Sequence, residues 1–228
     1  MGLFGPPEWV DLPKRTGHPP TVLPPAPPRP QPAPIADGFE DTPVGSQPQG
    51  ATVSGEEKGA SIRVTDEAAA SGQHSLKFTD APGLSQVWQP HLFYTPRFKE
   101  GLLCCSFDLR IEEGAVAWME WRDSGQPYRV GPSLQIDEAG QVRANGQALL
   151  SVPVGEWFHV EIVCGLGKQA TGTYDLTVTL PEEAPHVFPE QPCGHEEFRR
   201  LDWLGFVSLA SEAAVFYLDN LELQEKKE

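Results

Sequence analysis

The sequence predicts an all-β fold: an antiparallel two-sheet jelly-roll β-sandwich behind a proline-rich, extended N-terminal linker. Short runs of β-branched, aromatic and alternating apolar residues recur about every 8–14 residues from residue 36 onward. Glycine, proline, aspartate and asparagine residues separate these runs. No stretch of about twelve residues carries the period of an amphipathic helix. Roughly thirteen strands in about 190 residues exceed an immunoglobulin-type domain and suit a jelly roll.

The N-terminal part of the chain differs in composition from the rest. Twelve of the 24 prolines fall within residues 1–36, and residues 24–30 read Pro-Pro-Ala-Pro-Pro-Arg-Pro. Such a run favours polyproline II and acts as a semi-rigid spacer, although it could also be a ligand for an SH3-type domain. We predict three parts: residues 1–35 as a linker or the tail of an upstream domain, 36–224 as the sandwich, and 225–228 as a charged tail.

Turn residues support the breaks between the predicted strands. Asn145-Gly146 is a type I′ hairpin signal, and Glu138-Ala139-Gly140 ends another hairpin. Only residues 66–71 and 196–201 are expected to form a helical turn. The predicted strands are residues 37–41, 51–54, 60–66, 73–79, 101–111, 115–122, 130–136, 140–144, 147–150, 156–165, 172–180, 201–210 and 213–224.

The last strand is the one around which we expect the sandwich to close. Its residues 215–223 are mostly apolar or aromatic, but Asp219 interrupts them. A carboxylate in a buried strand needs partners, because burying it unpaired is costly. We predict that the first strand, residues 37–41, pairs with the last strand and closes the sandwich.

The chain is acidic, with a formal net charge of −15. This charge disfavours attraction to nucleic acid or to an anionic membrane, so we expect neither as a partner. No run of 18 apolar residues is present, and no segment is predicted to span a membrane. No signal peptide is visible at the N-terminus, so the protein is either cytosolic or part of a longer secreted chain. An acidic surface suits simple solubility as well as calcium-dependent secreted modules.

Four cysteines are present, without the spacing of a zinc site: Cys104, Cys105, Cys164 and Cys193. Cys105 and Cys164 alternate with apolar residues and are expected in the core. They are either buried free thiols or a disulfide, and the disulfide requires that their two strands face each other.

Three short motifs stand at the start, in the middle and at the end of the predicted sandwich: Gly38-Phe39-Glu40-Asp41, Ala70-Ser71-Gly72-Gln73-His74-Ser75-Leu76-Lys77, and Phe216-Tyr217-Leu218-Asp219-Asn220-Leu221. Together they resemble the pattern of jelly-roll carbohydrate-binding modules and of the related concanavalin A-like lectin and glucanase sandwiches. The resemblance spans residues 37–224 and implies a curved sheet whose concave face is the ligand platform.

The N-terminal segment Gly2-Leu3-Phe4-Gly5-Pro6-Pro7-Glu8-Trp9-Val10 carries a second, shorter resemblance. It is similar to the closing segment of parallel β-helix domains in large bacterial polysaccharide-processing proteins. This resemblance implies an upstream β-helix domain as a partner, and it is why we favour a secreted, extracellular protein.

The first resemblance also implies a structural calcium ion between the first and last strands. Glu40 and Asp219 match its side-chain ligands, loop 71–77 would add backbone carbonyls, and Asp37 and Asp41 are reserve ligands. Calcium takes six to eight oxygen ligands and tolerates irregular geometry, so these groups suit it. The alternative is that Asp219 accepts hydrogen bonds from backbone amides near a bulge.

Alternation assigns one side of each middle strand to the core and the other to the exterior. If these strands are neighbours in one sheet, their outward residues form a polar patch with one aromatic ring: Asp108, Arg110, Trp118, Glu120, Arg122, His159 and Glu161. Sugar binding needs this mixture, because a ring stacks on a pyranose while charged groups bind its hydroxyls. A solvated face of cross-strand ion pairs is the alternative. Further rim candidates are Trp88, Tyr94, Tyr128 and Trp203.

Catalysis has weaker support in the sequence. Glycoside hydrolysis needs two carboxyls, which Glu120 with Asp108 or Glu161 could supply on adjacent strands, but the Glu-x-Asp-x-x-Glu motif of sandwich glucanases is absent. A polysaccharide lyase could use His159 with Arg110 and Arg122. No serine-hydrolase, phosphate-loop, zinc-protease or dinucleotide motif is present.

We therefore predict a non-catalytic carbohydrate-binding module of a larger secreted bacterial protein, with a polysaccharide as its partner. The alternatives are a polysaccharide-degrading enzyme, either a glycoside hydrolase or a lyase, and a purely structural interaction sandwich.

Overall fold

The computed structural model describes residues 31–226. The predictions for the linker up to residue 30, for the segment that resembles a β-helix end and for residues 227–228 lie outside the described residues.

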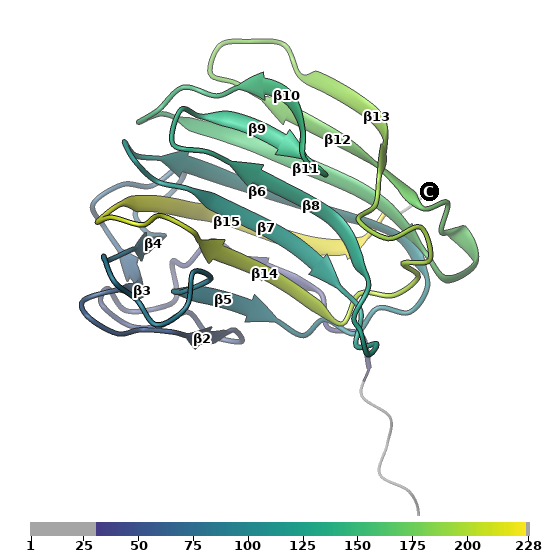
Figure 1. The fold of residues 1–228 in the computed structure, drawn as a ribbon, viewed down its shortest axis with the longest axis horizontal. Helices are drawn as coiled ribbons and strands as arrows, with labels where there is room; N and C mark the ends of the chain where they lie inside the picture. The colour runs from purple at the N-terminus through teal and green to yellow at the C-terminus, as the bar shows by residue number, and fades with distance from the viewer. Residues whose placement is uncertain (1–30, 227–228) are drawn as a thin grey trace, which may run out of the picture. The chain divides into compact units, whose positions relative to one another are not determined.

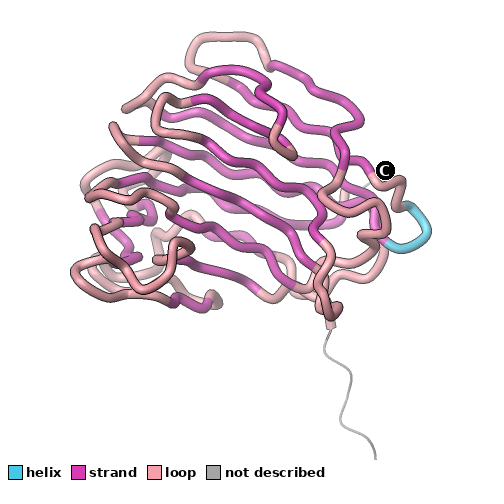
Figure 2. Tube along the Cα trace, in the orientation of Figure 1, coloured by secondary structure: helices cyan, strands magenta, loops and turns pink. Residues whose placement is uncertain are grey.

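The described chain forms two antiparallel sheets that pack face to face, which confirms the predicted all-β sandwich (Figures 1 and 2). The eight-stranded sheet contains, in order, β13 (His186–Pro192), β12 (Thr173–Thr179), β11 (Trp157–Leu166), β6 (Gly101–Ile111), β15 (Val215–Glu225), β4 (Ser75–Thr79) and β3 (Ser61–Thr65), with β1 (Ile35–Asp37) also paired to β15. The seven-stranded sheet contains β10 (Gln147–Ser151), β9 (Gln141–Ala144), β8 (Val130–Ile136), β7 (Ala117–Arg122), β14 (Trp203–Ser208), β5 (His91–Tyr94) and β2 (Thr52–Ser54).

Helix is almost absent from residues 31–226. The one helical element there is a short 3₁₀ turn, η1 (Gly167–Gln169). No helix in this part of the chain has the length and apolar character needed to cross a membrane.

Strands that are distant in sequence lie side by side, as a jelly roll requires. β15 lies between β6 and β4, and β14 lies between β7 and β5. The first and last strands pair, with Ile35 opposite Leu223 and Asp37 opposite Leu221, which confirms the predicted closure.

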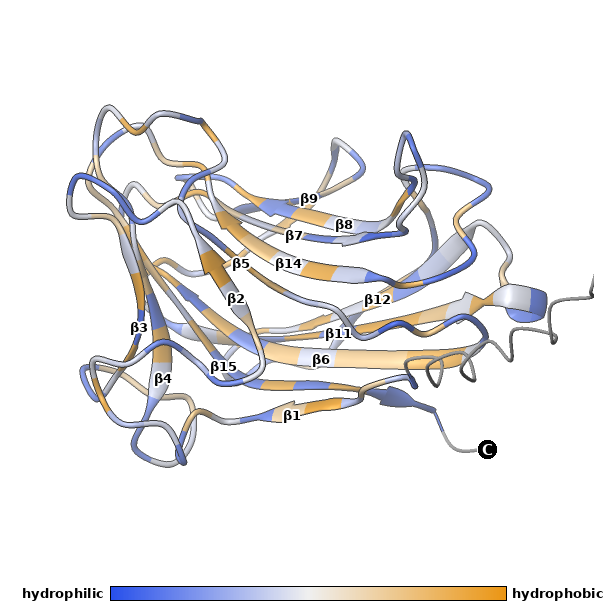
Figure 3. Cartoon of the chain, turned by 90° about the horizontal axis from the view of Figure 1, so that it is seen from below, coloured by the Kyte–Doolittle hydropathy of each residue, from blue (hydrophilic) through white to orange (hydrophobic). Residues whose placement is uncertain are grey.

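The core fills the space between the two sheets, and Figure 3 shows the hydrophobic residues along the central strands. On β6 the odd-numbered residues from Leu103 to Ile111 are buried, as alternation predicts, and on β7 Ala117, Met119 and Trp121 are buried. Phe107 on one sheet meets Phe206 on the other edge-to-face, with ring centroids 5.1 Å apart. Each fully buried ring or leucine of this size contributes about 1.5–3 kcal/mol to folding.

The turn and strand predictions are largely confirmed. Asn145 and Gly146 connect β9 and β10 with φ of 46° and 80°, the left-handed pair that a type I′ turn needs. Sequence patterns missed β5 and β13. The predicted strand 37–41 is displaced, because β1 ends at Asp37 and Phe39 has a φ of 62°.

The two predicted helical turns are wrong. Residues 66–71 form bends, because hydrogen bonds to Asp219 and Ser75 hold them: Ser75 Oγ donates to the Ala68 carbonyl at 2.6 Å. Residues 196–201 contain only a turn, and Leu201 is extended where it pairs with Phe98.

All four cysteines, each within the described part of the chain, are free thiols. β6 and β11 are neighbours in one sheet, with Cys105 opposite Ile162 and Cys164 opposite Leu103. The two strands do not face each other, so the condition for a Cys105–Cys164 disulfide is not met. Burial raises the pKa of the Cys105 thiol and keeps it protonated.

Candidate functional site

The seven residues predicted to bind a ligand are divided between the two outer faces of the sandwich. Trp118, Glu120 and Arg122 lie on β7 in the seven-stranded sheet. The other four lie on β6 and β11 in the eight-stranded sheet: Asp108, Arg110, His159 and Glu161. The chain crosses between sheets after Ile111, so the single patch expected from neighbouring strands does not form.

Trp118 is the aromatic residue on the outer side of β7. Its Nε1 donates a hydrogen bond of 2.8 Å to Oγ of Ser133 on the neighbouring strand β8. This bond directs the indole toward β8 and fixes the orientation of the ring. Because Trp118 remains partly exposed, it offers a pre-oriented ring surface to a ligand.

Glu120 and Arg122 form a buried ion pair beside this ring. The Arg122 Nε donates to the Glu120 carboxylate, of which only 4% is exposed. Burial raises the pKa of Glu120, and the charge of Arg122 and its hydrogen bond oppose that effect.

The Arg122 guanidinium is also stacked between two rings. Its central carbon lies 4.1 Å from the ring centre of Trp203 and 4.6 Å from that of Tyr128. The Trp203 ring lies over Gly205, where a Cβ atom would come within 2.0 Å of it. A glycine is therefore needed for this ring to lie flat on the sheet.

A row of rings continues from Trp203 onto β5. Phe93 stacks on Trp203 with centroids 5.7 Å apart, and His91 stacks on Phe93 at 6.0 Å. Trp88 meets His91 edge-on at 5.3 Å. Burial lowers the pKa of His91, and the positive charge of Arg122 lowers it further, so this imidazole is neutral near pH 7.

The outer face of the seven-stranded sheet is hollowed next to Trp118. The hollow has a volume of about 320 Å³, and its polar lining includes Glu120, Ser133, Gln135, Arg143 and Asn145. Loops at both ends of this sheet extend past its outer face (Figure 3). The arrangement brings a ring surface together with hydrogen-bond donors and acceptors, which is what a sugar-binding groove requires.

The outer face of the eight-stranded sheet is built differently. Asp108 accepts a hydrogen bond from Asn220 Nδ2 at 2.6 Å through one oxygen, and its other oxygen lies 2.7 Å from His159 Nδ1. The Asp108 hydrogen bond raises the pKa of His159. Arg110 pairs with Glu112 at 2.6 Å. The contacts of Asp108 are cross-strand pairs, which are the arrangement considered as the alternative for the predicted patch, and Arg110 is paired with a residue just beyond the end of its own strand.

The two residues predicted to bind calcium, Glu40 and Asp219, hold one loop from two sides. The buried Asp219 accepts hydrogen bonds from Ala70 N at 2.8 Å and Ser71 N at 3.2 Å through one oxygen, and from Asn220 N at 2.7 Å through the other. Burial raises the pKa of Asp219, against the effect of these amides.

Glu40 holds the same loop from its other side. One oxygen accepts hydrogen bonds from Gln73 N at 2.8 Å and His74 N at 2.9 Å, and these amides lower the pKa of Glu40. We call the two carboxylates and loop 70–74 the amide clamp. The clamp joins the chain near β1 to the bulge in β15, where Asn220 has a φ of 49°.

In the amide clamp, backbone N–H groups bond to both carboxylates. The loop directs N–H groups, not carbonyl oxygens, toward the carboxylates. Within residues 31–226, no group of three His, Cys, Asp or Glu side chains could hold a metal ion. The alternative for Asp219, backbone amides near a bulge, describes this geometry, and calcium binding stays a prediction.

The predicted rim aromatics take different places. Trp203 belongs to the face of β14, and Trp88 and Tyr128 are 45% and 51% exposed. Tyr94 is buried and belongs to a separate cavity. His91 and Phe93 were not predicted because β5 was not recognised as a strand. The alternation of His91 and Phe93 with the buried Leu92 and Tyr94 is the signal that could have identified β5.

No protein-family model matches this sequence, and no curated protein matches it either. Solved structures do match. The cellulose-induced protein Cip1 aligns over 84% of this chain and 97% of its own, with a TM-score of 0.58 and 15% identity.

Two alginate lyases are similar in the same way. The enzyme from Aplysia kurodai aligns over 72% of this chain and 87% of its own, with a TM-score of 0.54 and 10% identity. Alginate lyase Aly36B, solved as a mutant in complex with an alginate tetrasaccharide, aligns over 86% of this chain and 98% of its own, with a TM-score of 0.53 and 12% identity. These likenesses show the fold.

Proposed function

We propose that this protein binds a polysaccharide or other glycan without catalysis, on the outer face of the seven-stranded sheet. The observation that carries the proposal is the fixed indole of Trp118 beside a hollow lined with polar groups. The predicted contacts on β6 and β11 are not part of this proposal, because they lie on the other sheet.

The chemistry of the face suits a sugar. A pyranose has an apolar side that stacks on an aromatic ring, while its hydroxyls need donors and acceptors. Trp118 supplies the ring, and Gln135, Arg143 and Asn145 supply polar groups at the edge of the hollow. The names of the similar structures, two of them alginate lyases, support a carbohydrate ligand.

Affinity electrophoresis in gels that contain single polysaccharides tests this proposal. We expect at least one of a panel of neutral and acidic polysaccharides to retard the protein. Trp118→Ala should weaken that binding by about tenfold, or about 1.4 kcal/mol, because it removes a central aromatic contact. The proposal would be contradicted if no polysaccharide slowed the migration of the wild type, or if Trp118→Ala were retarded as strongly as the wild type.

A β-eliminating polysaccharide lyase is the second candidate. It is favoured by the neutral imidazole of His91, which could serve as the base, and by Arg122 on the same face, which could neutralise the carboxylate of a uronate. Arg122 lies over the ring of Tyr128 on this face. An ultraviolet assay for unsaturated products separates the candidates: product formation that His91→Ala abolishes would establish the lyase and replace the binding-only proposal.

Glycoside hydrolysis is less well supported by the geometry. The partners considered for Glu120 were Asp108 and Glu161, and both lie on the opposite outer face. The pair of carboxyls on adjacent strands is therefore not formed. We also propose, from the sequence alone, that the protein is secreted and that a β-helix domain precedes it. The full reading frame of the gene tests both proposals.

A further inference from the structure

A second cavity lies on a different part of the sandwich, between the segment that enters β1 and the link that follows β5. It has a volume of about 460 Å³ and is lined by residues 33–37, 41–42, 49–50 and 94–97. We call it the Tyr94 cavity. Ala33 N donates a hydrogen bond of 2.9 Å to the Pro96 carbonyl, which joins the two segments at one end of the cavity.

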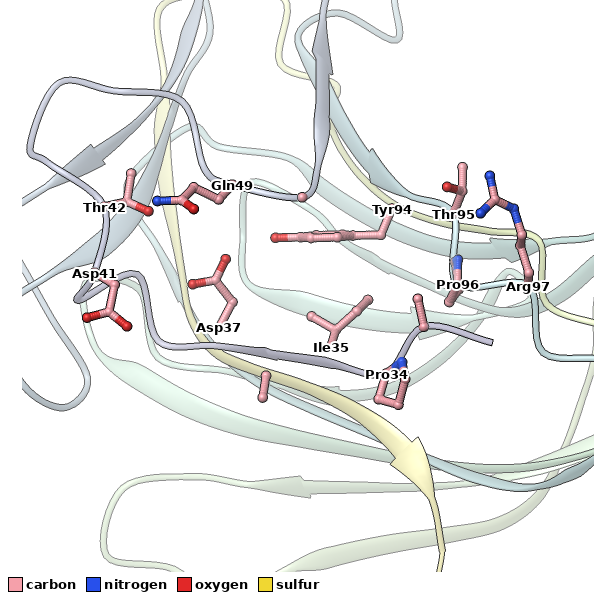
Figure 4. A pocket seen from close by; sticks show the side chains of 13 residues that line it. Pro34, Ile35, Asp37, Asp41, Thr42, Gln49, Tyr94, Thr95, Pro96 and Arg97 are labelled. Carbon is pink, nitrogen blue, oxygen red and sulfur yellow. The ribbon is translucent and has the colours of Figure 1, made fainter. Parts of the chain in front are cut away.

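Two carboxylates, Asp37 and Asp41, line the Tyr94 cavity. Asp37 is half-buried, accepts a hydrogen bond from Phe39 N at 2.8 Å and lies beside the Tyr94 hydroxyl. Within residues 31–226, neither Asp37 nor Asp41 forms an ion pair. Burial raises the pKa of Asp37, and the negative charge of Asp41 adds to that effect. Arg97 also lines the cavity, but it lies at the end away from Asp37 and Asp41, so the negative charge is concentrated at one end (Figure 4).

Tyr94 forms one wall of the cavity and is 5% exposed. Figure 4 shows its ring opposite Ile35, with its hydroxyl directed toward Asp37 and Gln49. Burial raises the pKa of Tyr94, and the charge of the neighbouring Asp37 and its hydrogen bond add to that effect. Within residues 31–226, however, no partner reaches this hydroxyl with the geometry of a full hydrogen bond. A buried hydroxyl without a full hydrogen bond is uncommon in a folded protein and points to a missing partner.

We propose that the Tyr94 cavity binds a small organic cation that carries a primary ammonium group. Asp37 and Asp41 provide the opposite charge, and Gln49 and the Tyr94 hydroxyl provide further polar contacts. The Tyr94 ring and Ile35 contact the body of the ligand, and an aromatic face also attracts a cation. The volume lies within the range of small-molecule sites.

A bare metal ion fits the same cavity less well. Calcium needs about six to eight oxygen ligands at about 2.3–2.6 Å, whereas the side-chain oxygens of this cavity are distributed around a much larger space. Apolar walls such as Ile35 and Pro34 contribute nothing to a metal ion, but they suit the carbon skeleton of an organic ligand.

Isothermal titration of the full chain with matched pairs of ligands tests the proposal. Glucosamine is compared with N-acetylglucosamine, and Nα-acetyl-lysine methylamide with its Nε-acetylated form, at about pH 6.5, where the amines are largely protonated. Within each pair, acetylation removes the ammonium charge and adds one acetyl group, and the rest of the carbon skeleton is unchanged. We expect at least one amine to bind about tenfold or more tightly than its neutral partner.

Variants assign the binding to the Tyr94 cavity. Asp37→Asn keeps an oxygen that can accept from Phe39 N, so the turn is retained while the charge is removed. Asp37→Asn and Asp41→Asn should each reduce the preference for the amine by about tenfold, and Tyr94→Phe should weaken binding by a smaller factor. Asp66→Asn, an exposed carboxylate outside the cavity, is the matched control and should bind as the wild type does.

The outcomes separate clearly. Preference for glucosamine identifies an amino sugar, and preference for the lysine derivative identifies a peptide side chain. Equal binding within both pairs, no binding of either amine, or unchanged binding by the Asp41→Asn and Tyr94→Phe variants would overturn the proposal. Stabilisation by calcium chloride but not by the amines would also overturn it.

Discussion

The two outer faces of this sandwich carry similar residue types but use them differently. On the eight-stranded sheet, Asp108 is bonded to His159 and Asn220. On the seven-stranded sheet, Trp118 is fixed by Ser133 but keeps ring surface available, next to a hollow of about 320 Å³. Both faces contain internally paired charges, but only the seven-stranded sheet places a partly exposed, fixed indole beside a hollow with a polar lining.

This difference shows that an outward-pointing polar residue is not by itself evidence for a binding site. Alternation identified both sets of outward residues correctly, but only the partners of each side chain separate a structural role from a ligand-binding role. The amide clamp is the strongest structural case, since it ties both ends of the sandwich to one loop. The predictions below test whether the faces differ in this way.

Replacing Asp219 should have the largest effect. Asp219→Ala leaves three backbone N–H groups near β15 without an acceptor, so we expect a loss of about 3 kcal/mol or more in unfolding free energy. Urea denaturation followed by tryptophan fluorescence measures it. Glu222→Ala, an exposed carboxylate on the same strand, is the control and should change stability by less than about 0.5 kcal/mol. Equal effects of both variants would show that the clamp is not structural.

Gly72 gives a second test of the clamp. Its φ is 65°, and a Cβ atom there would lie 2.2 Å from Glu40 Oε1. Gly72→Ala should therefore cost about 1–2 kcal/mol, because it combines backbone strain with a displaced carboxylate. Gly45→Ala, at a φ of 82° with open space around it, is the matched control for backbone strain alone. A cost no greater than that of Gly45→Ala would remove the contact with Glu40 from the account.

The pKa values of His159 and His91 should be shifted in opposite directions from the ordinary value of histidine. His159 should have a pKa above 6.5, since Asp108 favours its charged form, and His91 should have a pKa below 6.5, since burial and Arg122 disfavour it. Resonances of the imidazole carbons in NMR measure both. Asp108→Asn should move the His159 pKa down and leave that of His91 unchanged. Shifts of the same sign in the wild type would contradict the difference between the faces.

The direction of each pKa shift also determines how that histidine makes the stability of the protein depend on pH. The raised pKa of His159 contributes stability that is fully present below pH 6.5 and is lost as the pH rises through the folded-state value. The lowered pKa of His91 contributes stability that is present above pH 6.5 and is lost as the pH falls through the folded-state value. Denaturation of the Asp108→Asn variant between about pH 5 and 9 should show only the second trend.

A chelator should have the smallest effect. If the amide clamp alone holds loop 70–74, the thermal midpoint should be the same with calcium and with a chelator. A bound calcium ion would instead raise the midpoint in proportion to the logarithm of its concentration. A clear decrease on chelation would support the predicted calcium at Glu40 and Asp219 and show that the clamp is incomplete without it.

Much of the fold could be predicted because period-2 patterns are local. The alternation on β6, the Asn145-Gly146 turn and the pairing of the end strands all follow from short stretches of sequence. Alternation shows which side of a strand each side chain occupies, but it does not show to which sheet the strand belongs. For that reason the sequence grouped β7 with β6 and β11, although a sheet crossing after Ile111 separates them.

The candidate site was accessible to prediction only in part. Trp118, Glu120 and Arg122 were correctly grouped because they share one strand. His91 was missed because β5 was not recognised as a strand, although His91 and Phe93 alternate with buried residues. The acceptors and donors around Asp219 could not be predicted either, since the amides of residues 70 and 71 leave no side-chain pattern.

The central claim is that the outer face of the seven-stranded sheet binds a glycan and the opposite face does not. Each face has a partly exposed tryptophan on an inner strand that can be compared with the other, Trp118 on β7 and Trp157 on β11. The most direct test measures the affinity of Trp118→Ala and Trp157→Ala for whichever polysaccharide retards the wild type. We predict that Trp118→Ala loses about tenfold in affinity while Trp157→Ala binds like the wild type. Loss of binding in Trp157→Ala with full binding in Trp118→Ala would contradict the claim and assign the ligand to the other face.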